Sequence, residues 1–334
     1  MKVNDAINAE KAAQVGFTES LIALTAFALA AVKIPVGYGF EAERKLRDVV
    51  PRIQTSLDFC PPVRKIRAAR QSTTGRKDTD FKERKITVGG VECTFWYAST
   101  SSHLKGQQRQ ASSSLSSFTA FLQSCDEIEL FPPGVLNVAE ERQGACTMPT
   151  KPFRGGSSPG SEGGIVDSEV AKSGFLFQWS ITCPACQTEQ FLDAFGNLLK
   201  MTKQESDSGT IEEVYLDATG RPIDWHHHDD STHERKIDST YIGCSACNHE
   251  LRAEVLNRGC FRCRRTGETL VDLCDRASRT QTAIRKTVAI RLPRLAPALF
   301  NAPERLRKLI ESRNPVDQLQ QGLGKPLLID VCII

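Results

Sequence analysis

The chain has 334 residues, of which 40% are apolar and 25% are charged, so it can form a globular core in two domains or in one domain with an insertion. Lysine and arginine number 43 against 40 aspartates and glutamates, which excludes an acidic tail protein and a histone-like polycation. The longest largely apolar run, residues 21–32, is too short to span a bilayer. Six of the 12 cysteines fall in C-x-x-C pairs and no signal-peptide pattern is seen, which predicts metal binding in a reducing cytosol.

The first hundred residues have alternating helix and strand patterns. Residues 21–32 predict a buried helix, because apolar residues lie on most of its faces. A short buried strand is expected at residues 34–38 and an amphipathic helix at residues 41–53. Residues 64–85 hold nine basic and three acidic residues and form either a solvated loop or a contact to a phosphate backbone. Residues 86–98 alternate around a Gly-Gly pair, which predicts a hairpin.

Two strands and a linker are expected further along the chain. Residues 118–125 predict a strand that ends on two carboxylates. Residues 155–164, G-G-S-S-P-G-S-E-G-G, are typical of a flexible segment. Residues 175–182 predict a strand that runs into the first C-x-x-C pair.

Residues 11–18, K-A-A-Q-V-G-F-T, precede the buried helix and match part of the G-x-x-x-x-G-K-[ST] phosphate loop. Gly16 and Thr18 stand at the second glycine and at the Ser/Thr, whereas Lys11 stands at the first glycine. Because such a loop curls around the phosphates, a lysine at its first position can face the same anion as one at its seventh. Either this is a phosphate loop whose threonine holds Mg²⁺, or it is an ordinary turn before a helix.

Asp126 and Glu127 end the strand predicted at residues 118–125. In phosphoryl transfer the first carboxylate would hold Mg²⁺ and the second would polarise the attacking water. A solvated acidic turn after a strand is the alternative. Gln123 and Ser124 make this strand less apolar than a central parallel strand usually is.

Five segments, in order, resemble the large terminase subunit of tailed phages, in its lambda-type GpA branch. That family has a phosphate loop with the lysine displaced to the front, K-S-A-Q/R-V-G-[FY]-[ST], and an acidic strand, L-L-L-D-E-V-D-x-[YF]-P. It also has an S-T-P-T coupling motif, a C-P-x-C-G turn and a late F-x-N-x-x-L-G-x-P motif. The similar segments here are residues 11–19, 118–132, 146–150 (C-T-M-P-T), 182–187 (T-C-P-A-C-Q) and 318–326 (Q-L-Q-Q-G-L-G-K-P).

The resemblance implies an α/β fold of the P-loop NTPase type, with a mostly parallel sheet, helices on both faces and an inserted zinc-ribbon module. The implied domains are an ATPase core at residues 1–180, a zinc-ribbon-like insertion at 181–265 and a return to the core at 266–334. The family's nuclease domain and much of its adenine-side segment are expected to be absent, so no DNA cleavage is expected.

The implied function is ATP-driven packaging of double-stranded DNA into a prohead, in the cytoplasm of a bacterial host. The partners would be the small terminase subunit, the portal and other copies of the chain, with no membrane. Glu127 would activate water, Thr147 would couple hydrolysis to movement, and ATP and Mg²⁺ would be held by Lys11, Gln14, Gly16, Thr18 and Asp126. The alternative is an inactive prophage remnant or a zinc-ribbon fragment that binds nucleic acid.

Each of the pairs Cys183/Cys186 and Cys244/Cys247 can give two thiolates to one tetrahedral Zn²⁺. A third pair, Cys260/Cys263, follows, and 57 residues separate the first two, so spacing alone leaves the pairing open. The resemblance favours the first two pairs, because the family's second pair follows an aromatic strand. The zinc would be structural.

Other polar residues allow weaker interpretations. The run His226-His227-His228 reads either as metal binding or as a solvated loop. Candidate DNA contacts are Lys105, Arg262, Arg264 and Arg265, with a solvated surface as the alternative.

Overall fold

The computed structural model describes residues 6–11, 16–65, 81–82, 84–98, 118–144, 152–160, 163–193, 196–197, 199–205, 211–217, 241–280 and 287–292. The chain divides into two units. The first comprises residues 1–8, 16–157 and 281–288, and the second comprises residues 9–15, 158–280 and 289–334. Strands β1 (Ala6–Lys11) and β13 (Val288–Leu292) each have residues in both units.

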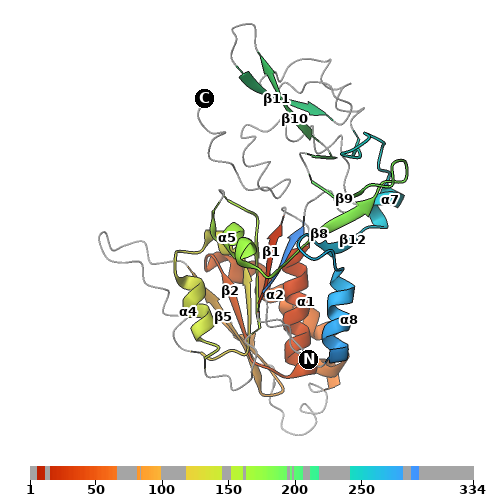
Figure 1. The fold of residues 1–334 in the computed structure, drawn as a ribbon. Helices are drawn as coiled ribbons and strands as arrows, with labels where there is room; N and C mark the ends of the chain where they lie inside the picture. The colour runs from red at the N-terminus through yellow and green to blue at the C-terminus, as the bar shows by residue number, and fades with distance from the viewer. Residues whose placement is uncertain are drawn as a thin grey trace, which may run out of the picture. The chain divides into compact units, whose positions relative to one another are not determined.

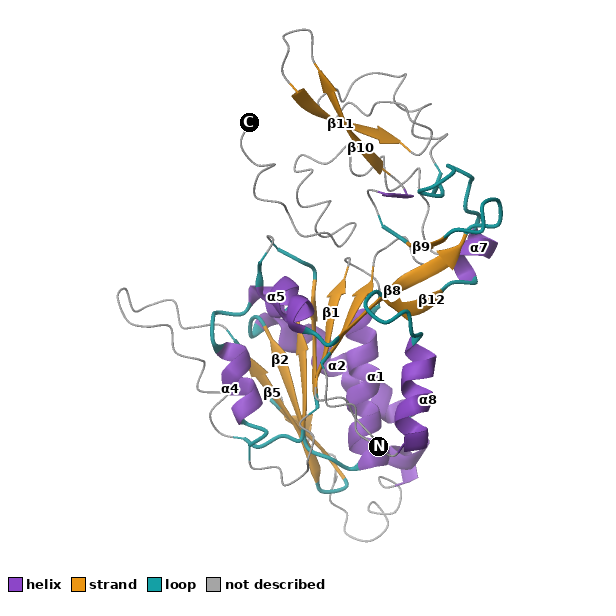
Figure 2. Ribbon diagram, in the orientation of Figure 1, coloured by secondary structure: helices purple, strands orange, loops and turns teal. Residues whose placement is uncertain are grey.

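The first unit is built on a mixed, mostly parallel sheet (Figures 1 and 2). Its strands are β2 (Val36–Phe40), β3 (Phe81–Lys82), β4 (Lys85–Val88), β5 (Val91–Tyr97), β6 (Leu122–Asp126) and β7 (Phe153–Ser157). They lie in the order β7-β6-β2-β5-β4-β3. The first four strands of this order are parallel, and β4 and β3 are added antiparallel. The hairpin predicted at residues 86–98 is therefore confirmed.

Helices cover both faces of this sheet. Helix α1 (Phe17–Phe27) continues into the π-helical turn η1 (Ala28–Val32), and with α2 (Arg44–Phe59) it buries apolar side chains against β2, β4 and β5. Helix α4 (Val135–Glu141) lies on the other face (Figure 2). The predicted α/β class, with a mostly parallel sheet between helices, is confirmed. The second predicted helix is longer than expected, because it continues through Pro51 as far as Phe59.

Strand β2, V-G-Y-G-F, separates its two faces by side-chain size. Tyr38 stacks on Phe40 with ring centroids 4.8 Å apart, and both lie in the core against α1 and α2. Gly37 and Gly39 face the other side, where a Cβ at Gly39 would lie 2.3 Å from Trp96 Cζ2 and one at Gly37 would lie 2.3 Å from Gln123 Oε1. Gly39 therefore makes room for a buried tryptophan on one neighbouring strand, and Gly37 makes room for a buried glutamine on the other.

Strand β6 is central and fully buried despite its polar residues. Gln123 accepts a hydrogen bond from Trp96 Nε1 at 3.2 Å and donates to the Ala139 carbonyl of α4 at 3.0 Å. A buried amide with both ends bonded can replace an apolar side chain at modest cost. The polar composition of this strand is thus compatible with a central position.

The prediction of a flexible segment at residues 155–164 is wrong at its start, because Phe153–Ser157 forms strand β7 and pairs in parallel with β6. Its glycines are packed closely. A Cβ at Gly156 would lie 2.3 Å from Phe17 Cε1, and one at Gly155 would lie 2.7 Å from Phe153 Cε1. The glycines therefore serve close packing in a central strand.

The second unit contains the strand predicted at residues 175–182, β8 (Phe175–Thr182), which pairs antiparallel with β9 (Glu189–Phe191) and β12 (Cys260–Cys263). A separate hairpin joins β10 (Leu199–Glu205) to β11 (Ile211–Asp217). The described part of this unit also contains helices α5 (Ile165–Lys172), α7 (Ala253–Asn257) and α8 (Leu270–Thr280). Within the described residues of the chain, no helix has the length and apolarity needed to cross a bilayer.

Candidate nucleotide and metal sites

Thr18 and Asp126 meet at the carboxyl end of β6 in the first unit. Gly16 is the N-cap of α1 and has a φ of 79°, a left-handed conformation that favours glycine. The first-turn N–H groups of a helix have no partner within the helix, and they can bind an anion such as phosphate. Two residues later, the Thr18 hydroxyl donates to Asp126 Oδ2 at 2.6 Å. Hydroxyl and carboxylate oxygens are hard ligands, so this pair fits Mg²⁺.

Glu127 follows with an unusual backbone conformation. Its φ of 55° lies in the left-handed region, which costs a residue other than glycine about 1–3 kcal/mol. Its N–H donates to Asp126 Oδ1 at 3.1 Å, and its Oε2 accepts from Ser157 Oγ at 3.0 Å. Ser157 is buried at the end of β7, where Gly156 pairs with Asp126. The first hydrogen bond fixes the Glu127 backbone, and the second holds its carboxylate beside the end of the sheet.

Sequence reasoning missed Ser157, because it lay in the segment interpreted as a linker. No local pattern in the sequence marks this serine, because its place depends on β7 lying beside β6. It also missed Glu41, which follows β2. Burial raises the pKa of Glu41, a backbone hydrogen bond and nearby Lys45 oppose this shift, and the charge of Glu127 adds to it. Residues from the ends of β2, β6 and β7 thus gather at one edge, where open α/β sheets bind their ligands.

The other residues predicted to bind nucleotide or DNA are placed differently. Lys11 is buried at the last position of β1 and belongs to the second unit. Gln14, Lys105 and Thr147 lie outside the described residues. The roles predicted for these four residues stay predictions.

The four cysteines of the first two pairs form one cluster in the second unit. Their sulfur atoms all lie within 4.8 Å of one another, with 3.8 Å between Cys183 and Cys247 and 3.7 Å between Cys186 and Cys244. A tetrahedral zinc with Zn–S bonds of ~2.3 Å has S–S edges of about 3.8 Å, so the sulfurs fit Zn²⁺. Among the described residues this is the only group of three or more side chains that could hold a metal. The histidine run lies outside those residues.

Hydrogen bonding at Cys186 favours the thiolate form that a metal requires. The side chain and then the backbone of Thr188 lower the pKa of the Cys186 thiol to about 6. A lowered pKa makes the thiolate available near neutral pH. This is consistent with Cys186 as a metal ligand.

The two cysteine pairs lie in two separate tight turns that have the same hydrogen-bond pattern. In the first turn, Gln187 N–H donates to the Cys183 carbonyl at 2.9 Å, and Cys183 N–H donates to the Thr188 carbonyl at 3.0 Å. The second turn repeats both bonds around Cys244 and Asn248, each at 2.9 Å. Gln187 and Asn248 both have a φ of 59°. The two turns therefore present their cysteines in the same way.

The third pair is different, because Cys260 and Cys263 lie in strand β12. Residues three apart in a strand face opposite sides, so these thiols cannot chelate one ion together. A similar turn begins at Cys263, whose N–H donates to the Glu268 carbonyl at 2.8 Å and whose carbonyl accepts from Gly267 N–H at 2.9 Å. Thr266 stands there at the position of the second cysteine. This turn therefore offers one thiol and no pair.

The arginines predicted to contact DNA each have a protein partner in the second unit. Arg262 forms an ion pair with Glu189, and Arg264 lies over the Phe191 ring at 5.3 Å. Arg265 donates to carbonyls at the C-terminal end of α5. These contacts explain how the side chains are held, and DNA binding by them stays a prediction.

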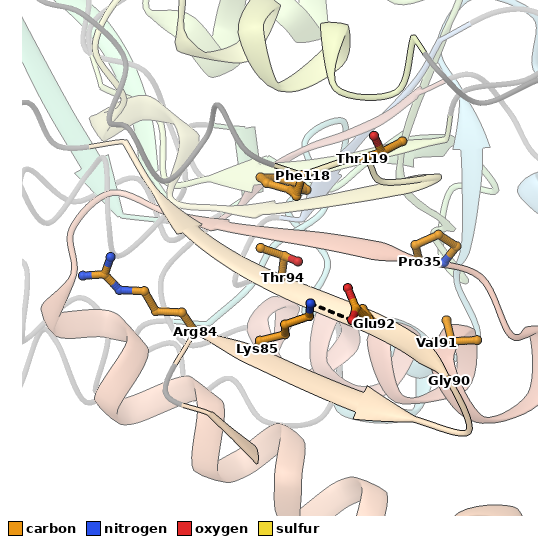
Figure 3. A pocket seen from close by; sticks show the side chains of 9 residues that line it. All are labelled: Pro35, Arg84, Lys85, Gly90, Val91, Glu92, Thr94, Phe118 and Thr119. Atoms are coloured by element: carbon orange, nitrogen blue, oxygen red, sulfur yellow. Dashed lines mark ion pairs between the residues drawn. The ribbon is translucent and has the colours of Figure 1, made fainter. Parts of the chain in front are cut away.

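A pocket of about 650 Å³ opens elsewhere in the first unit (Figure 3). Pro35 and Phe118 line it, and they precede β2 and β6, so the pocket lies at the amino ends of these strands. Lys85 and Glu92 form an ion pair of 2.6 Å beside it. It is therefore at the opposite end of β6 from Asp126, away from the edge where a nucleotide is expected.

No known family model matches the chain, and no curated protein matches it. Solved structures give partial matches. The large terminase of a thermophilic bacteriophage is 16% identical over 50% of this chain, with a TM-score of 0.33, and the HK97 bacteriophage large terminase is 13% identical over 50%, with a TM-score of 0.35. The Phi-28 gp11 DNA packaging motor is 11% identical over 64% of this chain and 76% of its own, with a TM-score of 0.25. The matches span only 37% and 32% of the two terminase chains, and TM-scores this low do not establish a family.

Proposed function

We propose that this chain is the ATP-hydrolysing motor part of a phage or prophage DNA-packaging terminase of the lambda-type GpA branch. It would translocate double-stranded DNA into a prohead, as a ring of copies that works with the small terminase subunit and the portal. The observation that carries the proposal is the 2.6 Å hydrogen bond from Thr18 to Asp126, with Glu127 directly after it. This contact joins two motifs that are far apart in the sequence.

Each residue has a distinct task in this proposal. Thr18 and Asp126 hold Mg²⁺, which neutralises phosphate charge when bound. The first-turn N–H groups of α1 and the side chain of Lys11 bind phosphate oxygens. Glu127 orients the attacking water through its carboxylate, and Ser157 fixes one oxygen of that carboxylate.

The remaining tasks are proposed from the motifs alone. Gln14 and Gly16 complete the phosphate loop. Thr147 couples hydrolysis to movement of the motor. In this account the zinc is structural and stabilises the second unit.

A second candidate is a zinc-stabilised module that binds nucleic acid without hydrolysing ATP. The four-cysteine cluster favours it, because the cluster is complete within the second unit and needs none of the carboxylates. Nucleotide binding discriminates between the candidates, since only the first requires it.

The test separates nucleotide binding from turnover. Glu127→Gln removes the carboxylate that orients water but keeps Thr18 and Asp126, so ATP binding should remain and hydrolysis should be lost. Lys11→Ala should instead weaken binding, because it removes the lysine of the loop. Binding is measured with a fluorescent ATP analogue, and turnover is measured as phosphate release. If Lys11→Ala binds and hydrolyses ATP as the parent does, the displaced-lysine interpretation is wrong.

A further inference from the structure

The two cysteine pairs are far apart in sequence but close in space. Residues 187 to 243 separate Cys186 from Cys244, and closing such a long loop costs conformational entropy. Contacts besides the metal that join the two turns offset part of this cost.

Gln190 of β9 joins the two turns directly. Its side chain is almost fully buried, and its Nε2 donates to Cys244 Sγ at 3.1 Å. Its Oε1 accepts from the Ser245 N–H at 2.9 Å and from the Ser245 hydroxyl at 2.8 Å. One side chain from the strand after the first turn therefore reaches both a sulfur and the backbone of the second turn.

Asn197 extends this contact and is also buried. Its Nδ2 donates to Gln190 Oε1 and to the Gly243 carbonyl, each at 2.8 Å. Its own carbonyl accepts from Gly243 N–H at 2.8 Å. Gln190 and Asn197 thus hold the residues on either side of the first cysteine of the second turn.

The third cysteine pair has no equivalent contact to this amide. Cys260 and Cys263 lie in β12, which is bonded to β8 along its length, and their side chains face opposite sides. Among the described residues, the Gln190 amide bonds to Cys244 and Ser245 of the second turn and to Asn197. The geometry thus distinguishes two pairs that sequence spacing left equivalent.

We propose that Gln190 is a positioning residue of the metal site, which presents the Cys244 sulfur and selects the second C-x-x-C pair as the partner of the first. This inference rests on the proposed zinc site. An N–H donor to a metal-bound thiolate stabilises its negative charge and fixes its direction. Residues that contact ligands in this way commonly contribute 10–100-fold to metal affinity.

The experiment titrates the full chain with Co²⁺ and Zn²⁺ under reducing conditions. Gln190→Ala should weaken Co²⁺ binding by about 10–100-fold and move the sulfur-to-cobalt charge-transfer band to lower energy, because the thiolate loses a hydrogen bond. Gln190→Met keeps the length of the side chain but has no N–H for Cys244. It should therefore bind Co²⁺ more weakly than the parent and move the band in the same direction as Gln190→Ala.

Gln178 provides a matched control in the same unit. It is buried, and its Nε2 donates to the Leu192 carbonyl at 2.7 Å rather than to a sulfur. Gln178→Ala should leave the band energy unchanged. The proposal is overturned if Gln190→Met binds Co²⁺ with the affinity and band energy of the parent. If the parent itself binds neither metal, the zinc site fails instead.

Discussion

Replacing Ser157 with alanine tests how the Glu127 carboxylate is held. The Ser157 hydroxyl donates to Glu127 Oε2 at 3.0 Å, and the substitution removes only this donor. A hydrogen bond to a charged group contributes about 1.5–3 kcal/mol. Each 1.36 kcal/mol lost from transition-state stabilisation slows a reaction tenfold, so kcat should fall by about 10–100-fold. Glu127 is half-buried, so water can replace part of the contact, which places the effect toward the lower end of this range.

The assay is steady-state phosphate release with saturating ATP and double-stranded DNA, together with the equilibrium affinity for nucleotide. Affinity should change little, because Thr18 and Asp126 are untouched. Ser158→Ala, at the next residue of the chain, is the matched control and should keep the parent kcat. Unchanged turnover in Ser157→Ala would refute the reasoning, as would an equal loss in both serine variants.

Three further predictions concern the metal, the packing and the pH dependence. Reduced protein should contain one zinc per chain by elemental analysis, and Cys183→Ser or Cys247→Ser should release it; zinc-free parent protein would contradict this. Gly39→Ala places a Cβ 2.3 Å from Trp96 and should lower the free energy of unfolding by about 1–3 kcal/mol in urea, so an unchanged midpoint would show that the site relaxes. Burial raises the folded-state pKa of Glu41, so the charged carboxylate lowers the stability of the fold at pH values above the ordinary pKa of glutamate. Glu41→Gln should therefore raise Tm at pH 7 but not at pH 4. An equal rise in Tm at both pH values would exclude the ionisation of Glu41 as the cause.

Local signals in the sequence predicted several elements correctly. The apolar run at residues 21–32 is helical, and the alternation around Gly89-Gly90 is a hairpin. The strand before the first cysteine pair has the predicted bounds, Phe175–Thr182. These features depend on periodicity and turn chemistry within a short segment, which a sequence displays directly.

Features set by distant contacts were not predictable in the same way. Gly155 and Gly156 are typical of a linker in composition, but in this central strand Phe153 packs against Gly155 and Phe17 packs against Gly156. The hydrogen bond from Trp96 explains why a glutamine is buried in β6. The contact of Ser157 with the acidic residues depends on the pairing of β7 with β6, which the sequence does not display. The choice among three cysteine pairs likewise depends on side chains brought together by folding.

The central claim is that the Thr18–Asp126–Glu127 arrangement belongs to an ATPase that acts on DNA. The most direct measurement is Mg²⁺-dependent phosphate release by the purified full chain, with and without double-stranded DNA. The account predicts hydrolysis that DNA accelerates and that Glu127→Gln abolishes while nucleotide remains bound. A parent chain that binds no Mg²⁺–ATP and releases no phosphate, while it retains its zinc, would contradict the account.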